Sequence, residues 1–367
     1  MKIIYVVKDI LHRYPPCISQ IVMLREQSVD VIVVTEMCDE ETTKMLTALD
    51  VKIELLGNFK ARANNLERVL RLFKFKNNAV RLLKKIYKDD DIIWIGTERT
   101  GIMLYRFLKN KTVILNDLEL NDTNWLYKMG VGRCLKHTNA VVACEKNRAR
   151  IMQTWYSVKK RPFVMPNKPY YELKCKKSTE VEVFEKKLLK KKYILYQGIL
   201  DKERPLDTIA DALNKTKEHY TFVIIGKGKS DESDNEYIEK LRGIYPDIIY
   251  GGYFPAPQHL YVTQNAYMGI AIYDTSSLNT LFCAPNKTFE YAKFGVPVLG
   301  SDIPGLQLTV EKYNAGICVD IEEPIQIAKA IDDIAENYEK YQVGAKVFYD
   351  SVDNRKVMKE ILKEVGL

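Results

Sequence analysis

The sequence of 367 residues predicts an α/β protein made of two doubly wound domains. Three observations support this prediction. Short apolar segments alternate along the chain with segments of helical periodicity. Segments such as Val29 to Thr35 and Asp91 to Gly96 are nearly continuous apolar runs, typical of parallel strands buried on both faces. A Pro-rich turn, Pro166 to Pro169, and a lysine-rich stretch up to Lys192 separate two such series.

Strands of the first half are expected at residues 2–7, 29–35, 51–55, 91–96, 112–115, 140–143 and 163–165, with helices between them. Strands of the second half are expected at residues 193–198, 221–225, 248–250, 268–273, 296–300 and 316–319. A last helix, at about 354–365, has no strand after it. We therefore expect a first domain at 1–168, a linker at 169–192, a second domain at 193–345 and a C-terminal helix within 346–367.

Several classes of protein are disfavoured by composition. There is no apolar run of about 18 residues, so no transmembrane helix is expected. The apolar start, Lys2 to Val7, is too short for a signal peptide. The seven cysteines contain no C-x-x-C pair, which argues against a disulfide framework or a zinc site and favours a reducing cytoplasm. The four histidines are dispersed, and no metal is expected.

Positive charge is concentrated in the first half of the chain. The net charge is +8, but residues 1–168 hold 30 basic and 18 acidic residues, a net of +12. The remainder carries a net of −4. The first half therefore favours an anionic partner.

The most basic segment, Lys60 to Lys88, has ten basic residues and one acid, Glu67, and its apolar residues recur at helical spacing. Such an amphipathic helix suits an anionic membrane surface. The residues expected to contact a membrane or an acceptor are Arg68, Arg71, Lys74, Arg81 and Lys84. An ordinary core-facing helix with a solvated basic back is the alternative, and the two are compatible. Nucleic acid is disfavoured, because no recognisable nucleic-acid module surrounds the segment.

Two acids follow the strand expected at 112–115. Catalytic groups of open parallel sheets lie beyond the carboxyl ends of the strands, and Asp117 and Glu119 are placed there. Either could act as a catalytic base on an acceptor hydroxyl. The alternative is that one of them caps the following helix.

The stretch from Pro285 to Gly300 predicts a turn, a short helix, a break at Gly295 and a buried strand. The start of this helix offers unpaired N–H groups and the positive end of its dipole, which suits a phosphate. Lys287 adds a positive charge, and Glu290 follows within one turn to bind the hydroxyls of a ribose. The alternative is a plain helix start with a surface glutamate.

These residues and three other segments resemble the donor-binding domain of glycosyltransferases with the GT-B architecture, of the glycosyltransferase family 4 kind found in bacterial surface-polysaccharide pathways. The segments that carry the resemblance are Tyr196 to Leu200 with Arg204 to Asp207, Val223 to Gly228, Gly252 to Pro255 with Leu260, and Pro285 to Tyr291 with Gly295 to Val298. The resemblance covers the second half well and the first half more loosely. It implies two Rossmann-like domains that face a central cleft, with a final helix that packs back on the first domain.

The resemblance also implies roles for individual residues. The turn at Gly198 would face the donor phosphates, Arg204 would bind the diphosphate, and Tyr253 with Phe254 would lie where the base is held. Lys287 would begin the phosphate-facing helix, and Glu290 would bind the ribose. The expected donor-binding residues are Gly198, Arg204, Gly226, Lys227, Tyr253, Phe254, Ser277, Asn279, Asn286, Lys287, Thr288 and Glu290.

One position departs from the family pattern. A second glutamate is expected eight positions before Glu290, where this chain has Phe282. In the family that glutamate approaches the sugar of the donor, so its loss leaves the sugar specificity and the retaining stereochemistry open. Ser276, Ser277 and Asn279 lie upstream and could supply polar contacts instead; alternatively, they form a capped loop.

The function that the resemblance implies is a hexosyltransferase that uses a nucleoside diphosphate sugar, UDP- or GDP-linked, and a lipid-linked or glycan acceptor. It would act in the cytoplasm, peripherally at the inner membrane face, without an obligatory metal or other cofactor. Two alternatives are a nucleotide-sugar epimerase on the same scaffold and a catalytically silent membrane-binding subunit. The epimerase fits the basic helix poorly, and the retained Arg204, Lys287 and Glu290 argue against the silent subunit.

Overall fold

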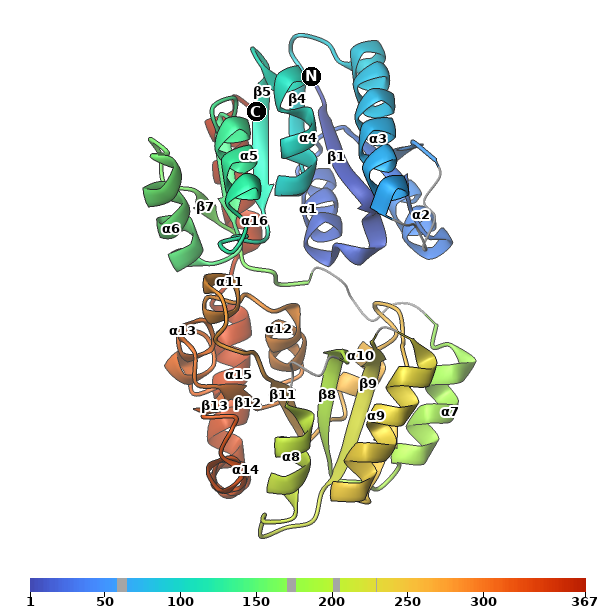
Figure 1. Ribbon diagram of the computed structural model, residues 1–367, viewed down its shortest axis with the longest axis vertical. Helices are drawn as coiled ribbons and strands as arrows, with labels where there is room; N and C mark the ends of the chain where they lie inside the picture. Colours follow the sequence, from blue (N-terminus) through green and yellow to red (C-terminus); the bar gives the residue numbers. More distant parts are fainter. Residues whose placement is uncertain (58–64, 170–175, 201–204, 229) are drawn as a thin grey trace. The chain divides into compact units, whose positions relative to one another are not determined.

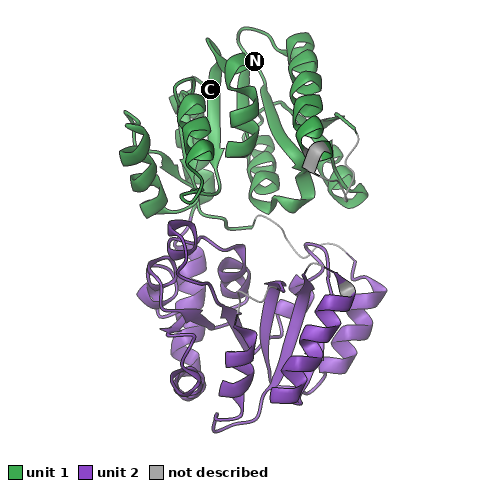
Figure 2. Ribbon diagram, in the orientation of Figure 1, with its two compact units in different colours: residues 1–170, 353–367 green, residues 171–352 purple. Residues whose placement is uncertain are grey.

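The computed structural model describes residues 1–57, 65–169, 176–200, 205–228 and 230–367 (Figure 1). The chain divides into two compact units, shown in Figure 2. Unit 1 comprises residues 1–170 and 353–367, and unit 2 comprises residues 171–352. Each unit is built around one parallel sheet with helices on both faces.

Unit 1 has a seven-stranded sheet in the order β3-β2-β1-β4-β5-β6-β7. Its strands are β1 (Ile3–Ile10), β2 (Val31–Met37), β3 (Lys52–Leu55), β4 (Ile92–Ile95), β5 (Thr112–Asp117), β6 (Ala140–Ala143) and β7 (Phe163–Val164). Its helices are α1 (Pro15–Glu26), α2 (Glu40–Thr47), α3 (Asn65–Ile86), α4 (Glu98–Leu108), α5 (Trp125–Leu135), α6 (Lys146–Tyr156) and α16 (Asn354–Glu364).

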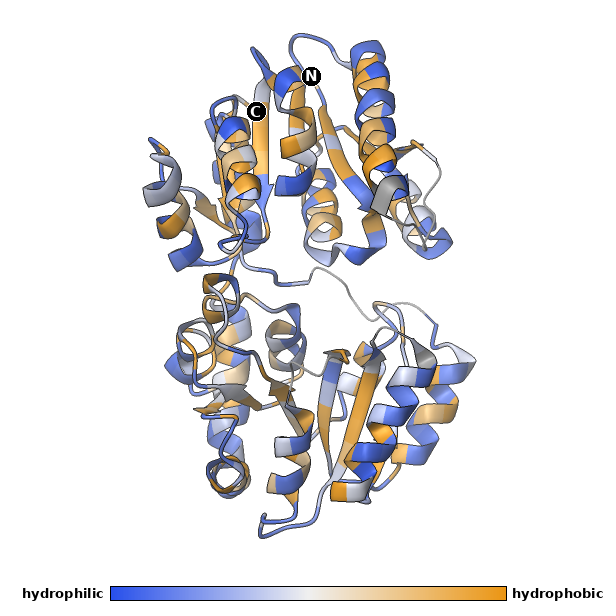
Figure 3. Ribbon diagram, viewed as in Figure 1, coloured by the Kyte–Doolittle hydropathy of each residue, from blue (hydrophilic) through white to orange (hydrophobic). Residues whose placement is uncertain are grey.

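Both faces of this sheet are covered, which explains its apolar strands, coloured orange in Figure 3. On one face, Phe75 and Leu83 of α3 and Leu104 of α4 pack on Ile4 and Ile93 of the sheet. The other face is covered by α1, α2 and α16. The chain order reverses between β1 and β4, so the carboxyl ends of these two strands form the switch point at which open α/β sheets bind ligands.

Unit 2 has a six-stranded parallel sheet in the order β10-β9-β8-β11-β12-β13. Its strands are β8 (Tyr193–Ile199), β9 (Thr221–Lys227), β10 (Ile248–Tyr250), β11 (Met268–Ala271), β12 (Val298–Ser301) and β13 (Gly316–Val319). Its helices are α7 (Thr179–Leu188), α8 (Leu206–Leu213), α9 (Asp231–Ile244), α10 (Leu260–Thr263), α11 (Leu278–Leu281), α12 (Asn286–Lys293), α13 (Pro304–Gln307), α14 (Pro324–Glu336) and α15 (Tyr338–Asp350). Here the switch point lies between β8 and β11.

One segment differs from the expected domain plan. The predicted linker, 169–192, contains helix α7, whose Phe184 and Leu188 are buried in the core of unit 2. Ser178 caps this helix by accepting a hydrogen bond from the backbone N–H of Val181. The lysines of this stretch lie mostly on the exposed face of the helix or around its ends. Because they are so frequent, the composition of the segment resembled that of a linker.

The last helix, α16, belongs to unit 1 although its sequence follows unit 2. Its Met358, Ile361 and Leu362 are buried against α1 and the sheet. The Asn354 side chain donates a hydrogen bond of 2.8 Å to the Pro166 carbonyl, which anchors the start of the helix. The amphipathic spacing of these apolar residues gives the helix one apolar side, which packs on unit 1.

Candidate functional site

At the carboxyl edge of the sheet in unit 2, two strands end in glycines. Gly198 ends β8 with φ +143°, and Gly226 ends β9 with φ +136°. A β-carbon on Gly226 would lie 1.8 Å from the Gly198 carbonyl oxygen, so only glycine fits there. This bare edge lets a ligand approach the backbone closely.

Lys287 places a cation at this edge. It lies in the first turn of α12, and its side chain is 8% exposed. Its Nζ lies 4.6 Å from the centre of the Tyr196 ring and 5.5 Å from that of Tyr273. These cation–π contacts hold the ammonium beside Gly198, where a β-carbon would lie 3.0 Å from Nζ.

The start of α12 is suited to an anion. Its N-cap is Pro285, which provides no side-chain hydrogen bond to the first turn. The first N–H groups of a helix have no partner within it, and the dipole is positive there. The positive end of α12 and the buried ammonium of Lys287 thus lie at the same place. This arrangement suits a phosphate.

Glu290, one turn further along α12, is held in a buried polar network. Its Oε2 accepts a hydrogen bond from Gln197 Nε2, and its Oε1 lies 3.3 Å from His259 Nε2. Gln197 Oε1 in turn accepts a bond of 2.7 Å from the Thr263 hydroxyl. Glu290 is 7% exposed, so it is not the surface charge of the alternative interpretation.

Sequence reasoning missed three members of this network, Gln197, His259 and Thr263. Gln197 could have been found, because it directly precedes Gly198 at the end of a buried strand. His259 and Thr263 could not, since only the packing of α10 against α12 brings them to Glu290.

The turn after β10 has one exposed and one inward-facing aromatic ring. Tyr253 is 54% exposed, and the Lys227 ammonium lies 4.6 Å from its ring centre. Phe254 instead packs on Phe184 of α7, with ring centres 5.4 Å apart. Gly252 accepts a hydrogen bond of 2.7 Å from the Gly226 N–H and joins this turn to the glycine edge. Of the two rings, Tyr253 is therefore the one that solvent reaches.

The other predicted donor residues are engaged locally or lie outside the described part. Ser277 forms a capping box with Thr280 at the start of α11, as in the capped-loop alternative, and Asn279 lies half-buried in the same helix. Thr288 is buried and donates to the Pro285 carbonyl at 2.9 Å, while Asn286 is half-buried at the first position of α12. Arg204 lies outside the described residues.

In unit 1, the two predicted acids have different environments. Asp117 is buried at the end of β5, whereas Glu119 is exposed. Burial, and then the Glu98 carboxylate, raises the pKa of Asp117 well above its usual value, although the Arg148 guanidinium opposes this. Neither acid caps the next helix, because Asn124 caps α5; that alternative was wrong.

A third acid, Glu98, completes this group and was not predicted. It is buried at the start of α4 and accepts hydrogen bonds of 3.2 Å from the Leu118 N–H and from the Tyr127 hydroxyl. Burial is the main cause that raises its pKa to about 7, and the Glu119 carboxylate adds to the effect. Of these three acids, Glu119 is the exposed one.

The predicted membrane residues of α3 point in different directions. Arg71 faces inward, with its Nη2 3.6 Å from Asp9 Oδ1 and 3.9 Å from Glu36 Oε2, unlike the exposed basic residues of the same helix. Lys74, Arg81 and Lys84 are exposed as expected, and the side chain of Arg68 lies outside the described part. No helix in the described ranges is long and apolar enough to cross a membrane, and no three-residue metal-ligand group occurs among the same residues.

Residues 191–337 match the family model described as Glycosyl transferases group 1. No protein in the curated sequence collection matches the chain.

Solved structures similar to the whole chain include HepE from Anabaena in complex with UDP and glucose, with 13% identity, a TM-score of 0.73, and coverage of 99% of this chain and 98% of that chain. A glycosyltransferase from Rickettsia africae ESF-5 has 14% identity, a TM-score of 0.70 and coverage of 99% and 98%. WaaG, a glycosyltransferase involved in lipopolysaccharide biosynthesis, has 12% identity, a TM-score of 0.65 and coverage of 99% of both chains. The expected fold of two Rossmann-like α/β domains is confirmed.

Proposed function

We propose that this chain is a glycosyltransferase that transfers a sugar from a nucleoside diphosphate sugar to a lipid-linked or glycan acceptor. Its residues 191–337 match the glycosyl transferases group 1 model, and its fold is that of the GT-B structures described above. The donor is a UDP-sugar, in keeping with the UDP and UDP-glucose complexes of HepE, which shares the fold. The pathway is bacterial surface-polysaccharide synthesis, as the resemblance to family 4 implies.

The observation that carries the proposal is the meeting of Lys287, the start of α12 and the bare Gly198 edge. A sugar transfer leaves negative charge on the departing diphosphate, and prearranged positive groups stabilise that charge most when they are shielded from water. Lys287 is held in place by two aromatic rings and loses little conformational freedom on binding. These groups neutralise the diphosphate without a metal ion.

The network around Glu290 supports a role in holding the ribose. A carboxylate accepts hydrogen bonds from both hydroxyls of a ribose, provided that its orientation is fixed. Gln197 and His259 fix it here, one on each carboxylate oxygen. Ligand binding would then replace or share these contacts.

We propose that the acceptor domain is unit 1, with Glu119 as the group closest to an acceptor-activating base because it is exposed beyond β5. Peripheral binding at the inner membrane face is supported by the outward face of α3. This face carries exposed Val69, Leu70 and Phe73 beside Lys74 and Arg81. Apolar residues beside cations are typical of helices that lie in a bilayer interface.

The proposal is tested by titrating UDP into Glu290→Ala and the wild type by calorimetry, with EDTA present. Charged hydrogen bonds contribute roughly 1.5–3 kcal/mol each, so the affinity should fall about 10- to 100-fold. Glu339→Ala, an exposed glutamate on α15, is the matched control and should bind UDP normally. Unchanged affinity in Glu290→Ala would rule out the donor site, and loss of wild-type binding in EDTA would rule out metal-free binding. A panel of UDP-sugars then identifies the sugar that is hydrolysed or transferred.

A further inference from the structure

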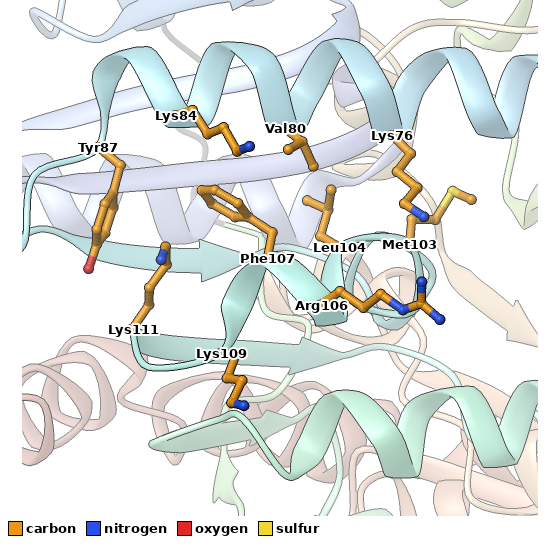
Figure 4. Close-up of a pocket in the computed structure, with 10 residues that line it drawn as sticks. All are labelled: Lys76, Val80, Lys84, Tyr87, Met103, Leu104, Arg106, Phe107, Lys109 and Lys111. Atoms are coloured by element: carbon orange, nitrogen blue, oxygen red, sulfur yellow. The ribbon is translucent and has the colours of Figure 1, made fainter.

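Unit 1 contains a groove of about 560 Å³ between α3 and α4, away from the candidate sites (Figure 4). Lys76, Val80 and Lys84 point from α3 toward Leu104 and Phe107 of α4. Lys109 and Lys111 border the groove just before β5 begins, whereas Asp117 ends that strand. The groove therefore lies at the amino edge of the sheet, the length of a strand away from the acids beyond β5.

The groove is lined by five cations, Lys76, Lys84, Arg106, Lys109 and Lys111, and by no acid. Within the described part of the chain, none of the five forms an ion pair with a carboxylate. Cations gathered in one concave site repel one another and create a positive potential that an anion relieves. The groove thus has the electrostatics of an anion site, and its volume lies in the range of small-molecule sites.

The floor of the groove is aromatic. The Lys111 ammonium lies 4.8 Å from the ring centre of Phe107 and 5.0 Å from that of Tyr87. These contacts hold Lys111 over the floor, while the rings and Val80 provide apolar surface below the charges. A ligand with a phosphate and an apolar or glycerol portion would match both parts.

The groove continues an apolar stripe on α3. Val69, Phe73 and Val80 follow one another at intervals of four or seven residues and so lie along one side of the helix, and Tyr87 follows directly after its end. Val69 is 48% exposed and Phe73 is 58% exposed. The same side of α3 therefore offers apolar side chains at one end and the basic groove at the other, which suits a bilayer interface better than a soluble anion.

We propose that the groove between α3 and α4 binds the phosphate-bearing headgroup of an anionic membrane lipid. The inference rests on the membrane association in the proposed function and adds the site and the lipid chemistry. Lys84, Arg106 and Lys111 contact the phosphate, and Val69 and Phe73 enter the interface beside it.

The test compares the triple variant Lys84→Gln, Arg106→Gln and Lys111→Gln with the wild type in flotation with phosphatidylglycerol or phosphatidylcholine vesicles. Each basic residue near an anionic surface contributes about fivefold to binding, so the variant should bind phosphatidylglycerol vesicles about 100-fold more weakly. The matched control, Lys356→Gln, Lys359→Gln and Lys363→Gln, removes the same charge from the exposed side of α16 and should bind nearly as the wild type does. An equal loss of vesicle binding in both triple variants would show that the membrane attracts the positive charge of the whole protein, and it would overturn the proposed site.

A second arm identifies the source of the phosphate. Monomeric dihexanoyl phosphatidylglycerol should bind the wild type saturably and should not bind the groove variant, whereas inorganic phosphate and glycerol phosphate should bind much more weakly. Equal affinity for inorganic phosphate would overturn the lipid assignment. UDP binding is measured on the same proteins. If the wild type binds UDP but not vesicles, only this inference is contradicted. If it binds vesicles but not UDP, only the proposed donor site is contradicted. Thermal unfolding confirms that each variant is folded.

Discussion

The side-chain nitrogen of Lys287 lies against the backbone of Gly198. A β-carbon on Gly198 would come within 3.0 Å of Lys287 Nζ and within 3.8 Å of the Tyr196 hydroxyl oxygen. The helix α12 thus brings its lysine to the end of β8, and the missing side chain of Gly198 leaves the room that the ammonium occupies. The position of the Lys287 side chain therefore requires glycine at residue 198.

Gly198→Ala should therefore weaken UDP binding. The new methyl group meets the flexible end of Lys287 and forces it away from the glycine edge, and φ +143° disfavours any side chain. We expect a fall in UDP affinity of about tenfold in calorimetry, with destabilisation of about 1–2 kcal/mol in denaturant unfolding. Gly243→Ala is the control, because nothing lies within 4 Å of its β-carbon in α9; it should bind UDP normally. Normal UDP binding by Gly198→Ala would show that Lys287 does not need its present position.

Lys287→Met tests the charge of the lysine while keeping much of its volume. The variant loses the cation at the proposed diphosphate site, and methionine still packs on the Tyr196 ring. UDP affinity should fall by about 10- to 100-fold, and uridine affinity should change little, since uridine has no phosphate.

Lys340→Met is matched to this change, because Lys340 Nζ also lies over a tyrosine ring, at 4.8 Å from the centre of Tyr341. It is exposed on α15 and should leave both affinities unchanged. An equal loss of uridine and UDP binding in Lys287→Met would instead indicate a disturbed fold around α12.

The sequence was sufficient for the layout of unit 2 because local signals agree there. One short segment contains the turn at Pro285, the helix stop at Gly295 and the apolar run that follows. The structure has α12 and β12 at these positions. The partners of Glu290 could not be predicted in this way, since Gln197 and His259 come from other elements and meet it only after the sheet forms. Long-range packing of this kind leaves no local pattern.

The basic helix α3 shows a different limit. Its apolar residues are numerous enough to occupy two sides of the helix, and periodicity alone did not separate them. Phe75, Ala79 and Leu83 face the core, whereas Val69 and Phe73 are exposed. The inward turn of Arg71 depends on Asp9 and Glu36, two acids near the ends of β1 and β2 that are far from Arg71 in the sequence.

Glu98 predicts a distinct dependence of stability on pH. Its pKa is raised to about 7 in the folded state, while the unfolded chain titrates near the ordinary glutamate value. Between these two values the folded state holds a proton that the unfolded state has lost, so rising pH favours unfolding; above about pH 7 both states are ionised and the cost is constant. The wild type should lose roughly 3 kcal/mol of stability from this group between about pH 4.5 and pH 7.

Glu98→Gln removes this titration and can keep both hydrogen bonds, since its amide accepts from the Leu118 N–H and donates to the Tyr127 hydroxyl. The free energy of unfolding, measured by denaturant titration at several pH values, should therefore rise relative to the wild type as pH increases through this window. Parallel curves for the two proteins would show that Glu98 is ionised in the folded state throughout.

Arg71 and Lys74 lie one turn apart on α3, but Arg71 faces the acids of the sheet whereas Lys74 is exposed. Arg71 pairs with Asp9 and Glu36, and Lys8 and Arg99 also approach Asp9. Arg71→Gln removes one cation from this cluster, and we expect a loss of about 1–2 kcal/mol in denaturant unfolding, discounted because Arg71 remains partly exposed. Its binding to anionic vesicles should stay near that of the wild type.

Lys74→Gln should show the reverse. Lys74 is exposed, so its substitution should change stability by less than about 0.5 kcal/mol. Binding to phosphatidylglycerol vesicles should fall about fivefold, because Lys74 flanks the exposed Leu70 and Phe73 on the outward side of the helix. The two variants remove the same charge from the same helix, so net charge cannot explain a difference between them. Equal vesicle binding by both would mean that the outward face of α3 does not contact the membrane.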